Sequence, residues 1–316
     1  MNDGKGRLAD ATPQLAPTAM GPGMVTDARF ADIDGASRPG PCAERRMDAD
    51  HRVREQRWPL ENITAQCGLA NTAGWWNTVT AADLDGDGDV DLVGATSDGT
   101  ASSRRMRNIP ACIGRYGWNG RSDIVLGKEK EGKQLPVRGR ECSSQQCPVH
   151  HGALPHLRGF RQSGPQRIST PERLEKALHL TATHTRSAVF LNDGSGGFTT
   201  HDLPVQAQLA PIQGIVPMDV NADGRLDLVV AGNHWGAEVE TVRYDAGTGL
   251  VLLGDGKGSF APTTIARSGF FAWGNVKDLA LVRTGPDRVP TVIVANNNDR
   301  PQAFRLGRGL SALSAR

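Results

Sequence analysis

The stretch AADLDGDGDVDLVGA (81–95) carries an aspartate at every second position from 83 to 91. Carboxylates this close repel one another unless a cation lies among them or some of them take up a proton. In a calcium-binding loop, a chain bent at glycine brings the oxygens of alternate residues onto one centre. The spacing therefore predicts a metal-binding loop that is followed by a short apolar strand.

Each aspartate of this first acidic loop has a predicted role. Positions 1, 3, 5 and 9 supply side-chain oxygens, position 6 is a glycine that allows the sharp turn, and position 7 supplies its backbone carbonyl. The side-chain ligands predicted in this way are Asp83, Asp85, Asp87 and Asp91, and the carbonyl ligand is Asp89. A solvated turn rich in Asp and Gly is the alternative, but a turn does not require four oxygen side chains.

A second acidic loop repeats the pattern in DVNADGRLDLVV (219–230). The residues at the equivalent positions are Asp219, Asn221, Asp223, Arg225 and Asp227. The cationic side chain of Arg225 is compatible with a metal site if it points away and offers its carbonyl alone. Oxygen-only ligation favours Ca²⁺ over zinc or copper. Neither loop is an EF-hand, because position 12 is Gly94 or Val230 rather than glutamate.

A second repeated unit is a glycine turn followed by an apolar residue, in LNDGSGGF (191–198), LGDGKGSF (253–260) and the shortened MNDGKGRL (1–8). Asn-Asp-Gly and Gly-Asp-Gly supply the positive-φ positions of tight hairpins. The segment 276–299 predicts two strands without an acidic loop. Two damaged acidic loops, at 32–38 and 116–126, lack necessary oxygens, so we expect them to bind no metal.

Short apolar strands separated by Gly, Asp and Asn turns predict an all-β fold of repeated antiparallel sheets. The 38 glycines, 19 prolines and 5% aromatic residues agree with many turns and short strands. Units this small must stack to bury their faces, and four-stranded propeller blades fit best. One short helix is predicted at 170–180, capped by Thr170, with Leu174, Ala177 and Leu178 on one face.

The acidic loops, each followed by DLV, resemble the FG-GAP/VCBS repeat found in integrin α-chain heads and many bacterial surface proteins. The stretches LENITAQCGLANTAGWWNTVTAADLDGDGDVDLV (60–93) and 186–260 are also similar to proteins related to cartilage acidic protein. The resemblance covers roughly 1–35, 59–100, 119–147 and 170–305. It implies a calcium-binding propeller of seven or eight blades within a longer exported or cell-surface chain. The family's calcium ligands carry over to the ten loop positions named above.

The predicted organisation has five parts. They are an incomplete first blade with a disrupted tail (1–58), a blade with the first loop plus a degenerate blade (59–147), an irregular insertion with the helix (148–185), blades with the second loop (186–305), and a disordered tail (306–316). The segments 36–58, 101–118 and 148–169 show no strand period. Translation out of frame and genuine insertion both remain open, and the coding DNA distinguishes them.

The function predicted is that of a calcium-stabilised, non-catalytic binding or scaffold module whose ligand is a protein or a carbohydrate. Common hydrolase and metalloprotease motifs are absent from the sequence, and a hydrolase or lyase with a site in the central channel of a propeller is the alternative. The net charge of +2 indicates no class of partner. The basic cluster 104–107 has no aromatic partners or basic face around it, so no nucleic-acid partner is expected. No apolar run reaches the length of a membrane helix. A zinc site at Cys142, Cys147, His150 and His151 has no standard spacing.

Overall fold

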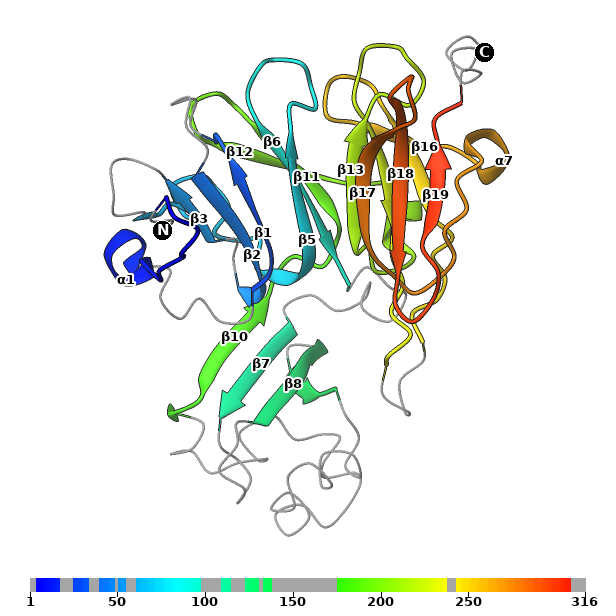
Figure 1. Cartoon of the computed structure of the whole chain (residues 1–316). Helices are drawn as coiled ribbons and strands as arrows, with labels where there is room; N and C mark the ends of the chain where they lie inside the picture. Colours follow the sequence, from blue (N-terminus) through cyan, green and yellow to red (C-terminus); the bar gives the residue numbers. More distant parts are fainter. Residues whose placement is uncertain are drawn as a thin grey trace.

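The computed structural model is built almost entirely of β-strands that form neighbouring sheets (Figure 1). It describes residues 4–17, 25–33, 40–48, 51–54, 61–97, 109–114, 123–130, 133–137, 175–237 and 243–307. The prediction of an all-β chain is confirmed. None of the sheets among these residues closes into a ring. None of their helices is long and apolar enough to cross a membrane.

Four antiparallel strands, which we call the first unit, hold the first acidic loop. They are β5 (Gly74–Ala82), β6 (Asp91–Thr96), β11 (Ala188–Asn192) and β12 (Phe198–Asp202). The acidic loop joins β5 to β6, and the LNDGSGGF turn joins β11 to β12. Strand β11 pairs with β6 although residues 97–187 separate them in the chain.

The sheet of the first unit continues beyond β5 into strands from the N-terminal part of the chain. These are β1 (Val25–Ala31), β2 (Gly40–Asp48), β3 (His51–Arg54) and β4 (Glu61–Asn62). Strand β2 pairs with both β1 and β5. Strands therefore occur within 36–58, where the sequence shows no strand period.

The second unit repeats the first with four consecutive strands. They are β13 (Gly214–Met218), β14 (Asp227–Ala231), β15 (Leu250–Gly254) and β16 (Phe260–Pro262). The second acidic loop joins β13 to β14, and the LGDGKGSF turn joins β15 to β16. Both acidic loops therefore connect the first two strands of a unit, and both glycine turns connect the last two.

A third sheet contains β17 (Val276–Thr284), β18 (Val289–Asn296) and β19 (Gln302–Arg305). A short turn joins β17 to β18, so the prediction of two strands without an acidic loop is confirmed. The described residues include three short helices, of which the last two each follow a hairpin. They are α1 (Thr12–Leu15), η2 (Val205–Gln208) and α7 (Ile265–Ser268).

Apolar side chains fill the space on both faces of each unit. One core joins the two units through residues such as Val93 and Leu228. A second joins the second unit to the third sheet, and a third lies on the β1 side of the first unit. Trp76, which is fully buried and stacks on His184, belongs to this last core. Every residue of β6 and β14 is buried, which explains their continuous apolar sequences.

The predicted helix at 170–180 is wrong over its last residues. Leu178–Ala182 form strand β10, which pairs along its whole length with β7 (Ile109–Gly114). Leu178 is 56% exposed, so it does not occupy the buried face of a helix. Two further strands, β8 (Asp123–Lys130) and β9 (Lys133–Pro136), complete this sheet. Pairing with a distant strand has overridden the local helical pattern.

Several predictions fall outside the described residues. These are the first part of the helix at 170–174, most of the damaged loops at 32–38 and 116–126, the basic cluster 104–107, the segment 148–169, the cysteine and histidine group at 142–151, and the tail beyond 307.

Candidate metal centre

The first acidic loop is held in shape by its own carboxylates. Asp83 accepts hydrogen bonds from the backbone N–H groups of Gly86, at 2.7 Å, and Gly88, at 3.1 Å. Both glycines have positive φ, 81° and 97°, a conformation that other residues rarely adopt. These glycines let the chain curl back over Asp83, as the sequence pattern requires.

Asp91 anchors the loop to the strands of the first unit. It is fully buried at the start of β6, and its two oxygens accept from the backbone N–H groups of Leu84, at 2.7 Å, and Asn192, at 2.8 Å. One carboxylate therefore joins the acidic loop, β6 and the end of β11. Any ion bound by Asp91 is thereby coupled to the framework of the first unit.

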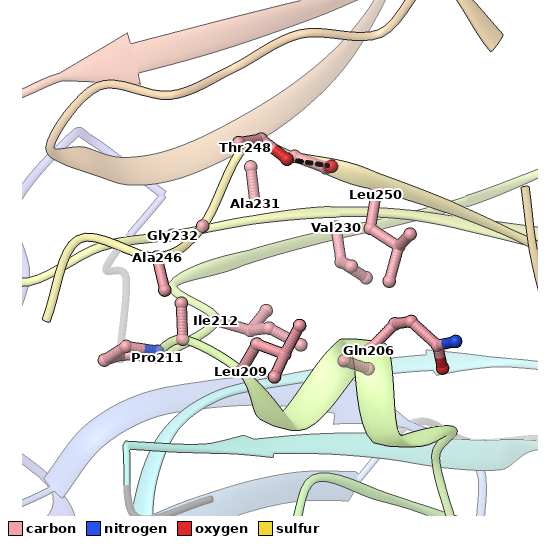
Figure 2. A pocket seen from close by; sticks show the side chains of 14 residues that line it. Gln206, Leu209, Pro211, Ile212, Val230, Ala231, Gly232, Ala246, Thr248 and Leu250 are labelled. Atoms are coloured by element: carbon pink, nitrogen blue, oxygen red, sulfur yellow. Dashed lines mark hydrogen bonds between the residues drawn. The ribbon is translucent and has the colours of Figure 1, made fainter. Parts of the chain in front are cut away.

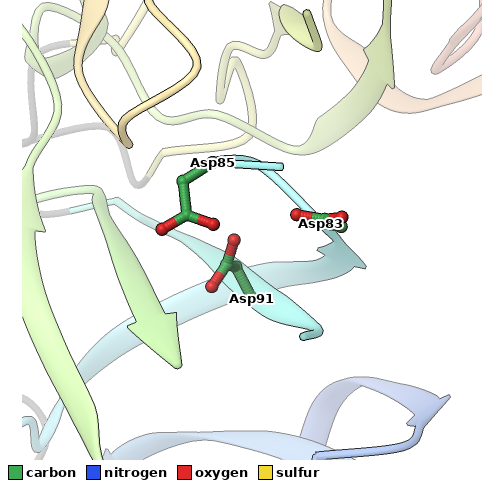
Figure 3. Close-up of side chains that lie close together, drawn as sticks. All are labelled: Asp83, Asp85 and Asp91. Atoms are coloured by element: carbon green, nitrogen blue, oxygen red, sulfur yellow. The ribbon is translucent and has the colours of Figure 1, made fainter. Parts of the chain in front are cut away.

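Three aspartates converge in this loop (Figure 3). Asp83, Asp85 and Asp91 each place an oxygen within 4.8 Å of the others. Burial, opposed by its two hydrogen bonds and reinforced by the charges of Asp85 and Asp87, raises the pKa of Asp91 to about 6. Burial, followed by the charge of Asp87, also raises the pKa of Asp85. A cation at this point would remove the repulsion and favour the ionised carboxylates.

The two remaining aspartates of the first loop lie differently. Asp87 is exposed and accepts from the backbone N–H of Asp89 at 2.9 Å, outside the close group of three. The Asp89 side chain lies against Gly194 in the turn between β11 and β12, where any added Cβ would clash with its carboxylate. The position-7 side chain thus faces the neighbouring hairpin.

The second acidic loop is held by a similar set of hydrogen bonds, although its first aspartate accepts from positions 5 and 6 rather than from positions 4 and 6. Asp219 accepts from the N–H groups of Asp223, at 3.2 Å, and Gly224, at 2.9 Å. Asp227 is fully buried and accepts from Val220 and Gly254, both at 2.8 Å. Burial, opposed by these bonds, raises the pKa of Asp227. The second loop therefore reproduces the anchoring of the first.

Two substitutions at predicted ligand positions distinguish the second loop. Asn221 replaces a carboxylate, and its side-chain N–H donates to Asp223 at 3.1 Å. Arg225 takes position 7, and its aliphatic carbons lie against Gly256 of the β15–β16 turn. Arg225 thus occupies the same place as Asp89 does in the first unit, directed toward a hairpin.

The contribution of Asn192 was not predicted from the sequence. Besides donating its backbone N–H to Asp91, it donates its side-chain N–H to the carbonyls of Ile33, at 3.0 Å, and Val90, at 3.2 Å. A signal existed in the sequence, because each acidic loop is accompanied by an Asp-Gly turn whose preceding residue makes this contact. Recognising it required knowing which turn belongs to which loop.

A separate pocket of about 180 Å³ lies at the other end of β14 from the acidic loop (Figure 2). Its walls come from η2, the end of β14 and the start of β15. Apolar side chains including Leu209, Ile212, Val230 and Leu250 line it, together with Gln206 and Thr248. None of the lining residues is titratable, so the pocket offers space but no acid–base group.

No protein-family model matches the chain, and no curated protein matches it either. The repeated loops and the framework that holds them are therefore the features that point to a function.

Proposed function

We propose that this chain is a calcium-binding β-propeller module of FG-GAP/VCBS type that acts as a non-catalytic binding or scaffold unit. One observation carries the proposal. Two acidic loops sit at the same place in two like units, each anchored by a buried aspartate that ties the loop to the third strand. A plain turn requires no such anchor.

The donor set of the loops fits a hard divalent cation. Every predicted side-chain ligand is a carboxylate or an amide oxygen, and Ca²⁺ prefers oxygen ligands in flexible arrangements. Asp83, Asp85, Asp87 and Asp91 would hold the ion of the first loop. Asp219, Asn221, Asp223 and Asp227 would hold that of the second, with the carbonyls of Asp89 and Arg225 as further ligands. The bound ion would supply structural charge neutralisation rather than chemistry on a substrate.

The propeller is the arrangement that the stacked units favour. Both faces of each unit are covered by neighbouring sheets, as blades require. The family resemblance adds an exported or cell-surface location and a protein or carbohydrate ligand.

Calorimetric titration of the EDTA-treated chain with CaCl₂ tests the proposal. We expect saturable uptake at two sites in the unmodified chain and loss of both in an Asp85→Ala, Asp223→Ala double variant. Asp287→Ala is the matched control, because Asp287 is an exposed acid in the turn of the third sheet and belongs to neither loop. Absence of saturable uptake in the folded chain would refute calcium binding.

A further inference from the structure

The sheets follow one another through a repeated contact between their first strands. Strands β1, β5, β13 and β17 are successive neighbours (Figure 1). Thr26 in β1 donates its hydroxyl to the carbonyl of Trp76 at 3.0 Å, and Asn77 in β5 donates to the carbonyl of Ile212 at 3.2 Å. Thr26 and Asn77 stand at equivalent positions, six residues before the first aspartate of their loops. The contact of β1 with β5 and the contact of β5 with β13 therefore follow the same rule.

The face that each sheet turns toward the next one, its forward face, is buried in both units. Val93 and Ala95 in β6 are fully buried, and Val229 and Ala231 in β14 are each 3% exposed. They pack into the cores that join each unit to its successor.

The third sheet carries the same kinds of apolar residue on its forward face, where they are exposed or half-buried. Leu92 in β6 and Val292 in β18 pair with equivalent residues of the preceding strands, β5 and β17. Along the strands from these two residues, Ile293 therefore corresponds to Val93 and Ala295 to Ala95. Ala295 is nevertheless exposed and Ile293 half-buried. Val282 on the same face is 37% exposed. The sequence of a buried face is thus present on a face that nothing in the described residues covers.

The opposite end of the stack exposes the complementary face. In β5, Trp76 and Val79 point back toward β1 and are 0% and 1% exposed. The corresponding residues of β1 are Val25, which is 41% exposed, and Ala28, which is also exposed. Phe30, on the same backward face, is 76% exposed. Among the described residues, a forward face and a backward face are therefore both exposed, at opposite ends of the series of sheets.

One polar residue of β1 recurs at the equivalent position of β17. Asp27 in β1 follows a bulge, and its carboxylate accepts a hydrogen bond from the backbone N–H of the neighbouring Ala28 at 2.8 Å. The carboxylate also accepts from the hydroxyl of Thr78 at 2.8 Å and from the backbone N–H of Val79 at 3.1 Å, both in β5.

Asp278 in β17 repeats the bulge and accepts from its neighbour Leu279 at 2.8 Å, yet it is exposed. By the rule that links the other first strands, Asp278 and its neighbour Lys277 face the place of a next first strand.

We propose that two copies of this chain associate head to tail, with the forward face of β17–β19 in one copy receiving the backward face of β1 in the other. Asp27 and Arg29 of the second copy stay directed at their own β5, so the apolar residues of the backward face make the new contact. A pair held by two such contacts uses the forward face and the backward face of each copy. This association is independent of calcium binding and goes beyond the proposed function.

Light scattering coupled to size-exclusion chromatography tests the association on the full chain. We expect the mass to rise from the single-chain 33.7 kDa to twice that value as the concentration is raised. Phe30→Asp and Val282→Asp should each abolish the rise. Ile265→Asp should not, because Ile265 is a comparably exposed apolar residue, 41%, on α7 and outside both faces. Circular dichroism melting establishes that the variants fold.

Mixing the two variants distinguishes a contact between unlike faces, forward on backward, from a contact between two like faces. A mixture of Phe30→Asp and Val282→Asp chains retains one intact forward face and one intact backward face on different molecules. Recovery of a dimer in the mixture, but in neither variant alone, supports the proposal. A chain that stays monomeric at every concentration overturns it, as does a mixture that remains monomeric although the unmodified chain dimerises.

Discussion

Asp91 is the residue on which the first acidic loop depends, because it has a structural role as well as a proposed metal-binding one. Its two oxygens satisfy backbone N–H groups from the loop and from β11, and it is fully buried. Asp87 contributes to the same predicted site but is exposed at the tip of the loop. Substitutions at these two positions should therefore differ when no metal is bound.

We predict that Asp91→Ala destabilises the metal-free chain by about 2 kcal/mol or more, since two buried N–H groups lose their acceptor. Asp87→Ala should change the stability of the metal-free chain by less than about 0.5 kcal/mol, as expected of an exposed site. Urea unfolding in EDTA at about pH 5, where protonation relieves the buried charge, measures both. Equal stability of the two variants would show that Asp91 has no anchoring role.

The raised pKa of Asp91 also predicts a pH dependence. Its folded-state pKa of about 6 exceeds the ordinary 3.8, so the folded state binds this proton more tightly than the unfolded state does. The stability gained from this group in the metal-free chain is therefore complete below about pH 4 and is lost as the pH rises through about 6. The loss is roughly 3 kcal/mol.

The measurement is the difference in unfolding free energy between the unmodified chain and Asp91→Ala, followed from about pH 4 to about pH 7 in EDTA. We expect the advantage of the unmodified chain to shrink across this interval. A difference that is constant with pH would contradict the raised pKa. With Ca²⁺ present the trend should reverse, because the ion binds the ionised carboxylate.

The acidic loops and glycine turns could be predicted at the level of single elements because their signals are local. Alternating aspartates, glycines at positive φ and a following apolar strand all lie within a dozen residues of one another. Strand β10 could not be predicted this way, since its partner β7 lies far away in the chain and its own sequence has a helical period. The link from Asp91 to Asn192 spans 101 positions and escaped prediction for the same reason.

The two loops should differ in calcium affinity. The first offers four side-chain carboxylates, whereas the second offers three and the amide of Asn221, and the number of charged ligands tunes affinity. We therefore predict that the loop at 83–91 binds Ca²⁺ more tightly. Calorimetry should show loss of the tighter event in Asp87→Ala and of the weaker one in Asp223→Ala. Survival of the tighter event in Asp87→Ala would reverse the assignment.

The order of the sheets is a property of the whole molecule that the sequence patterns do not contain. Residues 97–187 lie between the second and third strands of the first unit, and β6 nevertheless finds β11. Repeat patterns identify which segments form like units, but stacking decides which strands complete them. The exposed forward face of β17–β19 became recognisable only once its residues could be compared with the buried faces of the other units.

The largest predicted effect of calcium is on the stability of the whole stack. Each acidic loop closes a unit whose two faces support neighbouring cores, so an ion bound there stabilises the sheets on either side. An ion that binds the folded state alone adds about 2.7 kcal/mol to the free energy of unfolding at a concentration 100 times its Kd.

We expect EDTA to lower the melting temperature by about 5 °C or more and excess Ca²⁺ to restore it. Mg²⁺ should restore much less, because it sheds water reluctantly and requires octahedral geometry. A melting curve that EDTA leaves unchanged, in protein shown afterwards to be metal-free, would show that both acidic loops are plain turns with no stabilising metal ion.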